Sequence, residues 1–191
     1  MVAVPEAIAE IRRAAEVDPL SVPARNMLAE QLGDFDNCDE AIAEANRTLA
    51  ELSPNSPHIA MLHGTISTCY TKKGMPEEAF EEDVKSRIAA GATPQEIGDI
   101  RRIFAVSGRK GVLAKDVKDT LASWEKDHWH NDAYNLVWGY AALGDNDRAF
   151  IWMNKAAEVR STMLFWTYVY QRQLVSDPRF AEVKRKMSSH P

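Results

Sequence analysis

The residue types best suited to metal binding or acid–base chemistry include five histidines. They are His58, His63, His128, His130 and His190. No two of them have the i, i+4 spacing by which one helix presents two imidazoles to a zinc ion, and none lies beside a spaced cysteine pair. His128-Trp129-His130 falls in a predicted linker, where solvated histidines are ordinary. The sequence therefore predicts no metal site.

Nucleophilic and phosphate-binding patterns are also missing from the sequence. Cys38 and Cys69 are too few for a disulfide framework and lie in or near predicted helices, so we expect reduced thiols. Gly108-Arg109-Lys110-Gly111 lacks the spacing of a P-loop, and no nucleophile elbow or dinucleotide fingerprint occurs. No spacing brings carboxylates or a nucleophile together in a cleft. We predict no catalytic residue and no cofactor.

Charge and hydropathy restrict the partners. Aspartate and glutamate (28) outnumber lysine and arginine (23), giving −5, the wrong sign for a surface that follows phosphates. A direct nucleic-acid partner is therefore not expected. No window approaches 18 consecutive apolar residues, and the first residues lack the pattern of a signal peptide. We expect a cytoplasmic protein without membrane insertion, whose 191 residues form one domain.

The elements that must position any site repeat along the chain. Second helices begin near Ala7, Ala41, Ala79, Leu113 and Ala149, which are 34 to 38 residues apart. That interval matches a helix–turn–helix repeat of about 34 residues. First helices are predicted over 21–32, 59–73, 94–107 and 131–143.

A glycine is expected to end each first helix in a left-handed conformation. These glycines are Gly33, Gly74, Gly108 and Gly144. The predicted fold is all-α and built of antiparallel helix pairs. It consists of a half repeat (5–19), repeats over about 21–54, 57–91, 94–127 and 131–160, and a C-terminal cap (161–187). In the cap, Phe180 and Val183 are expected to face inward.

The last repeat resembles the tetratricopeptide repeat. The matching residues are Asn135-Leu136, Tyr140, Leu143-Gly144-Asp145, Ala149 and Ala156. The resemblance implies an α-solenoid with a right-handed superhelix. Residues 95–187 are also similar to the tetratricopeptide tail of bacterial signalling proteins, namely winged-helix transcription regulators, serine/threonine kinases and nucleotide cyclases. That similarity implies an effector or interaction arm.

The resemblance implies that the first helices form a concave face. This face is expected to bind a segment of a partner protein, without catalysis. The residues that it assigns to this face are Met27, Gln31, Thr68, Lys72, Gln95, Arg102, Asn131, Tyr134 and Trp138. Tryptophan, tyrosine and arginine are typical of binding hot spots. For Tyr134 and Trp138, core packing against the cap is the alternative. Lys72, Arg102 and Asn131 form only part of a carboxylate clamp, so we predict no chaperone-tail binding.

Two further interpretations stay open. The chain could be a ligand-sensing or oligomerisation domain of a bacterial transcription regulator. A homodimer could also cover the apolar side of the first helix, formed by Ile8, Ile11 and Ala15. The basic residues of 101–118 face either an acidic peptide or the acidic helix that starts at Glu77, and we expect intramolecular pairing.

Overall fold

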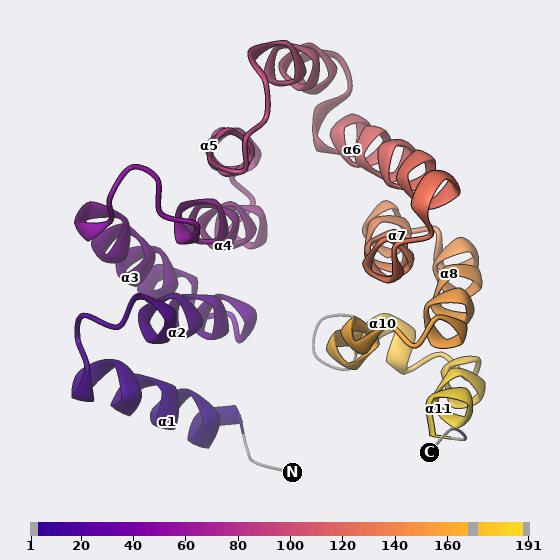
Figure 1. Ribbon diagram of the computed structural model, residues 1–191, viewed down its shortest axis with the longest axis horizontal. Helices are drawn as coiled ribbons and strands as arrows, with labels where there is room; N and C mark the ends of the chain where they lie inside the picture. Colours follow the sequence, from indigo (N-terminus) through magenta and orange to yellow (C-terminus); the bar gives the residue numbers. More distant parts are fainter. Residues whose placement is uncertain (1–3, 168–171, 189–191) are drawn as a thin grey trace. The chain divides into compact units, whose positions relative to one another are not determined.

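The computed structural model describes residues 4–167 and 172–188, and every regular element in these ranges is a helix. The helices are α1 (Val4–Val17), α2 (Val22–Asp34), α3 (Cys38–Glu51), α4 (His58–Lys72), α5 (Pro76–Ala89), α6 (Pro94–Asp127), α7 (His130–Leu143), α8 (Asn146–Glu158), η1 (Thr162–Trp166), α10 (Arg172–Val175) and α11 (Phe180–Ser188) (Figure 1). The predicted all-α class is confirmed.

Proline and glycine mark the helix ends much as the sequence predicts. Pro76 and Pro94 begin α5 and α6, where a missing amide hydrogen costs nothing. Gly144 ends α7 with a φ of 83°. Gly108, with φ 59° and ψ −160°, is the one non-helical residue inside α6 and divides it into two helical segments. Each segment corresponds to one helix of the predicted repeat over 94–127.

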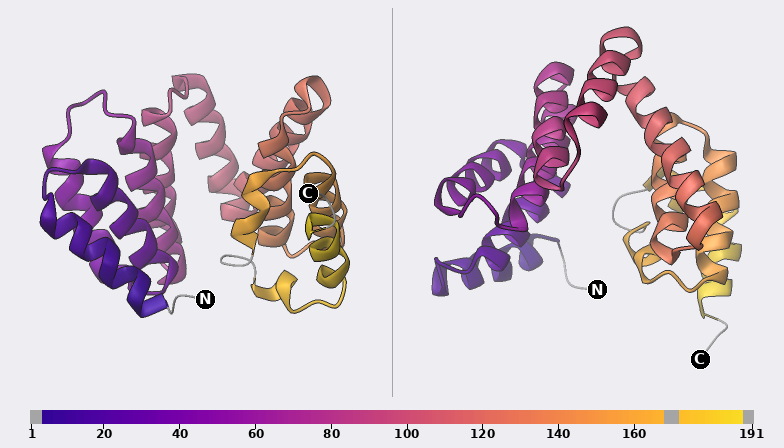
Figure 2. Two further views of the ribbon diagram at one scale, coloured as in Figure 1. Left: turned by 60° about the horizontal axis from the view of Figure 1, so that its bottom comes forward. Right: turned by 45° about the horizontal axis from the view of Figure 1, so that its top comes forward.

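The chain divides into two compact units, Met1–Arg101 and Arg102–Pro191, with the boundary inside α6. Figure 2 shows the helices of each unit from two further directions. Within the described ranges, no helix has an apolar stretch long enough to cross a membrane.

In the first unit, α2 packs against α1, α3 and α4, and α4 packs against α5. Fully buried small and aliphatic side chains fill the interfaces, among them Ala29, Ala45 and Leu62. The apolar side of α1 packs on the cluster that contains Leu28 and Leu32. The side chains that suggested a homodimer are therefore partly buried within this unit.

Gly33 corrects one prediction. It lies inside the last turn of α2 and does not end the helix; the left-handed residue after α2 is Asp36, with φ 65°. Gly33 is buried, and a Cβ atom there would lie 3.0 Å from Cys69 Sγ and 3.7 Å from Ala41 Cβ. Its small size, and not its backbone freedom, is what α2 needs in order to pack closely against α4 and α3.

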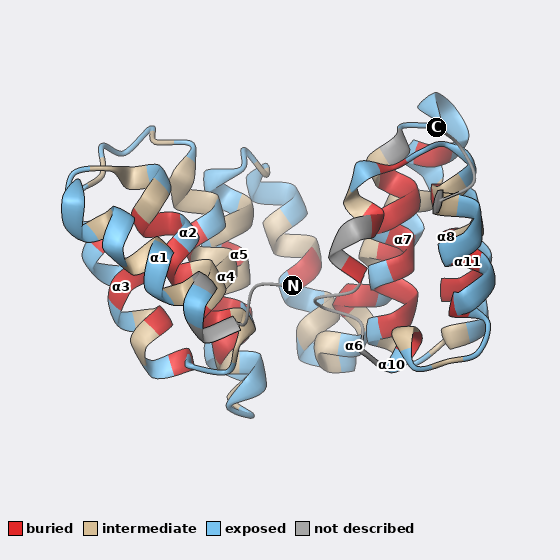
Figure 3. Cartoon of the chain, turned by 90° about the horizontal axis from the view of Figure 1, so that it is seen from below, coloured by how far each residue is buried: buried red, intermediate tan, exposed pale blue. Residues whose placement is uncertain are grey.

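In the second unit, α7 packs on α8, and α11 also packs on α8. Trp124 and Trp152 meet edge to face, with ring centroids 5.4 Å apart. Phe180 and Val183 of α11 are buried in the same core, as the predicted cap requires. Figure 3 shows the buried residues along α7 and along α2.

Candidate functional site

A depression of about 290 Å³ lies between α2 and α4 in the first unit. Its lining residues are Asn26, Glu30, Gly33 and Asp34 of α2 and Met61, Gly64, Thr65 and Thr68 of α4. Pockets that enclose a drug-sized ligand measure about 300–1,000 Å³. The depression lies at the lower end of this range and has room for a single side chain.

The α2 wall of the depression is polar. Asn26, Glu30 and Asp34 are spaced by four residues, so their side chains follow one face of the helix. Asn26 is only 6% exposed, and its Oδ1 accepts no hydrogen bond from the described part of the chain. Buried polar atoms are nearly always paired, so this acceptor is unusual.

The carboxylate of Glu30 makes no hydrogen bond or ion pair with any residue of 4–167 or 172–188. Partial burial raises the pKa of Glu30, and the neighbouring Asp34 charge raises it further. Both effects disfavour the negative charge at this position.

The α4 wall of the depression is less polar. Met61 is 51% exposed, and Gly64 contributes no side chain. Thr68 is exposed, and its hydroxyl donates to the Gly64 carbonyl one turn earlier at 3.0 Å. The α4 side therefore offers the apolar side chain of Met61, together with Thr65 and Thr68, beside the polar face of α2.

Lys72 lies near the end of α2 but does not neutralise Glu30. Its Nζ donates to the Gly33 and Asp34 carbonyl oxygens at 2.8 and 3.1 Å, and to Asp36 Oδ1 at 2.8 Å. A cation at this position complements the partial negative charge at the C-terminus of a helix. The hydrogen bonds of Lys72 thus link α4 to the C-terminal end of α2.

Of the predicted site residues in the first unit, only Thr68 lines the depression. Met27 and Gln31 lie on α2 one position after the lining residues Asn26 and Glu30, and Gln95 is exposed at the start of α6. Sequence reasoning missed Asn26, Glu30 and Asp34. Their polar i, i+4, i+8 spacing was the available signal.

The second unit holds the other predicted residues. Arg102 is exposed on α6, and Asn131 is half-buried on α7. Tyr134 is 6% exposed and belongs to the core, whereas Trp138 is 40% exposed. Trp138 therefore presents an aromatic surface on α7, whereas Tyr134 is part of the interior.

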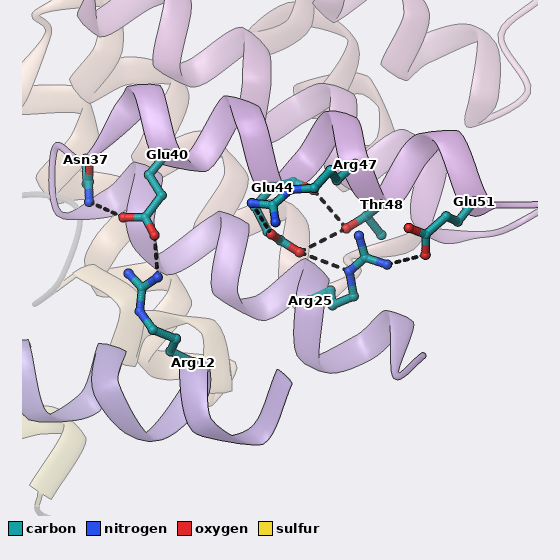
Figure 4. Close-up of polar contacts among 8 residues, drawn as sticks. All are labelled: Arg12, Arg25, Asn37, Glu40, Glu44, Arg47, Thr48 and Glu51. Atoms are coloured by element: carbon teal, nitrogen blue, oxygen red, sulfur yellow. Dashed lines mark hydrogen bonds and ion pairs between the residues drawn. The ribbon is translucent and has the colours of Figure 1, made fainter. Parts of the chain in front are cut away.

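A different side of α2 carries a network of ion pairs to α3 (Figure 4). Arg25 Nε donates to Glu44 Oε1 at 2.9 Å, and these side chains are only 10% and 9% exposed. Arg25 also pairs with Glu51, and Glu44 pairs with Arg47 at 3.0 Å. The Thr48 hydroxyl donates to the Glu44 carbonyl at 2.9 Å. The charges in this network satisfy one another.

A second depression, of about 700 Å³, lies beside this network between α1, α2 and α3. Arg12 on its wall donates to Glu40, and this hydrogen bond lowers the pKa of the Glu40 carboxyl. Asn37 donates to the other Glu40 oxygen at 2.7 Å. Since these charged groups are paired within the unit, we interpret this region as the contact that holds α1, α2 and α3 together.

The basic residues of α6 include one that pairs with the acidic helix α5. Arg101 donates to both carboxylate oxygens of Glu81, at 2.6 and 2.8 Å. This contact confirms intramolecular pairing for Arg101.

In the described ranges, no three His, Cys, Asp or Glu side chains come close enough together to hold a metal ion. No family model matches the chain, and no curated protein matches it either. The candidate site is therefore identified from the structure alone, as the depression between α2 and α4 and the exposed face of α7.

Proposed function

We propose that this protein is a non-catalytic interaction scaffold of the tetratricopeptide type. In this proposal, the helix pairs of each unit follow a right-handed solenoid arrangement. The exposed sides of the first helices, α2 and α4 in one unit and α7 in the other, bind extended segments of partner proteins.

The observation that carries the proposal is the depression between α2 and α4. Two first helices of neighbouring pairs pack side by side there and leave an open, partly polar surface. Stacked helix pairs characteristically bind their partners on such a surface. Asn26 Oδ1 is a buried acceptor that receives no hydrogen bond from residues 4–167 or 172–188, which suits a surface that is completed by another chain.

Exposed apolar side chains on these helices give further support. Met27 and Met61 are each 51% exposed, and Trp138 is 40% exposed. Methionine adapts its shape to different partners, and tryptophan is enriched among the residues that dominate binding energy.

The test begins with selection of peptides from a random display library on the full chain, followed by fluorescence anisotropy of labelled binders. Thr68→Phe would fill the depression without changing charge, and we expect it to weaken one group of binders about tenfold or more. Asn46→Phe introduces the same side chain at an exposed position of α3 and serves as the control.

The face of α7 is tested in the same assay. Trp138→Ala is expected to weaken a second group of binders about thirtyfold, the loss typical of a hot-spot tryptophan. Trp129→Ala, at the start of α7, is the matched control because that side chain is also half exposed. Recovered peptides that respond to neither Thr68→Phe nor Trp138→Ala would contradict the proposed function.

A further inference from the structure

We infer that the depression between α2 and α4 binds the cationic head of a lysine or arginine side chain from the partner segment. This inference rests on the proposed function and specifies the chemistry of the partner. The cation would lie between the Glu30 and Asp34 carboxylates and donate a hydrogen bond to Asn26 Oδ1.

The first argument is the charge of the lining. Glu30 and Asp34 are both acidic, and none of the described residues that line the depression is basic. Like charges at i, i+4 on a helix repel each other, and partial burial adds to the unfavourable energy of the charged form. A bound cation removes both penalties.

The second argument is the buried acceptor Asn26 Oδ1, which belongs to the first of the three polar residues along this face of α2. Asn26 is buried and lies one turn before Glu30, with its Oδ1 unpaired among the described residues. A lysine ammonium or an arginine guanidinium has only donors and several of them. One cationic head can therefore serve the amide oxygen and a carboxylate together, as no anionic or apolar group can.

The third argument is shape. A volume of about 290 Å³ has room for one long side chain. The exposed Met61 side chain offers an apolar surface for the methylene groups of lysine or arginine, and Gly64 leaves room beside it. The arrangement thus suits a long aliphatic stem with a charged end.

The neighbouring cation of this protein does not fill the role. Lys72 Nζ is already bound to two carbonyl oxygens at the end of α2 and to Asp36. His63 on α4 is also engaged, because its Nδ1 lies 2.6 Å from Glu82 Oε2 of α5. Among the described residues, Glu30 therefore has no counter-charge, and a partner can supply one.

The experiment uses the binders that Thr68→Phe weakens. Each of their lysines is replaced by norleucine and each arginine by citrulline, which keep the stem and remove the charge. We expect one such replacement to weaken binding to the full chain about tenfold or more, the value of a hydrogen bond to a charged group.

Variants of the protein give the matching measurement. Glu30→Gln and Asn26→Leu are expected to weaken binding of the original peptide about tenfold. They should change the affinity for the uncharged peptide little. Glu10→Gln removes the same charge from an exposed position of α1 and is the control. Circular dichroism of each variant shows that the fold persists.

The outcomes separate the two proposals. Binders that respond to Thr68→Phe but tolerate norleucine and citrulline would overturn the cation inference and leave the interaction surface standing. If Thr68→Phe weakens none of the binders, both the α2–α4 surface and the inference are refuted. An equal loss of affinity in Glu30→Gln and Glu10→Gln would also refute the cation inference. Such a result would indicate only long-range attraction between the peptide and the protein.

Discussion

The ion pair between Arg25 and Glu44 should make a large contribution to the stability of the first unit. Both side chains are about nine-tenths buried, and their Nε–Oε1 distance is 2.9 Å. Removing one partner of a buried ion pair typically destabilises a protein by about 3–5 kcal/mol, because the remaining charge is left in a poorly solvated site.

Neighbouring groups reduce that figure. In Arg25→Met, Glu44 keeps its ion pair with Arg47, whose side chain is 66% exposed. Glu44 Oε1 also keeps its contact with the Thr48 hydroxyl, at 3.5 Å. We therefore expect Arg25→Met to lower the free energy of unfolding by about 2–3 kcal/mol. The double variant Arg25→Met/Glu44→Met removes both charges and should lose only about 1 kcal/mol.

Urea unfolding followed by two probes gives a direct assay. All tryptophans of the chain lie in the second unit: Trp124, Trp129, Trp138, Trp152 and Trp166. Tryptophan fluorescence therefore reports on that unit, whereas far-ultraviolet circular dichroism reports on both. With an m-value of about 2 kcal/mol/M, the expected loss moves the circular-dichroism midpoint of the first unit by about 1 M.

The double-mutant cycle supplies the result that would refute the reasoning. A coupling energy near zero, with the double variant as unstable as both single variants together, would mean that the two charges contribute independently. A fluorescence transition that stays in place while the circular-dichroism transition moves would show that the two units unfold separately.

Two further predictions concern buried titratable groups. Burial, together with a hydrogen bond with Cys38, raises the pKa of Cys69 to about 12. Both thiols should resist Ellman's reagent in the native protein and react in guanidinium, and native-state reaction at the rate of a free thiol would disprove this. Glu30, with its pKa raised in the folded state, lowers stability above that pKa, and the penalty disappears as the pH falls below the ordinary glutamate pKa. Glu30→Gln should therefore stabilise the protein by about 0.5–1 kcal/mol at neutral pH and by less in acid, as thermal unfolding across pH would show. A variant less stable than the parent at neutral pH would contradict the assigned penalty.

The helices were predictable from sequence because their ends carry local signals. Proline at the start of α5 and glycine at the end of α7 act through their own backbone preferences, whatever surrounds them. Gly33 shows the limit of such signals. Glycine serves both left-handed turns and close helix contacts, and only the position of Cys69, far along the chain, decides which use applies.

The face of a helix is harder to predict, because burial depends on neighbours. Tyr134 and Trp138 are four residues apart on α7 and look equivalent in sequence. The surrounding core buries the tyrosine and leaves the tryptophan 40% exposed. No local property of either residue fixes that difference.

Arg25 and Asn26 show most clearly how the binding chemistry depends on tertiary structure. They are consecutive polar residues of α2, and both are buried. Arg25 faces α3, where Glu44 and Glu51 neutralise it. Asn26 faces α4, where its Oδ1 finds no donor in the described part of the chain. A folded chain tolerates an unpaired buried acceptor at a cost of about 1–3 kcal/mol. That cost is recovered if a partner supplies the donor, and the neighbouring Glu30 carboxylate favours a donor that is a cation.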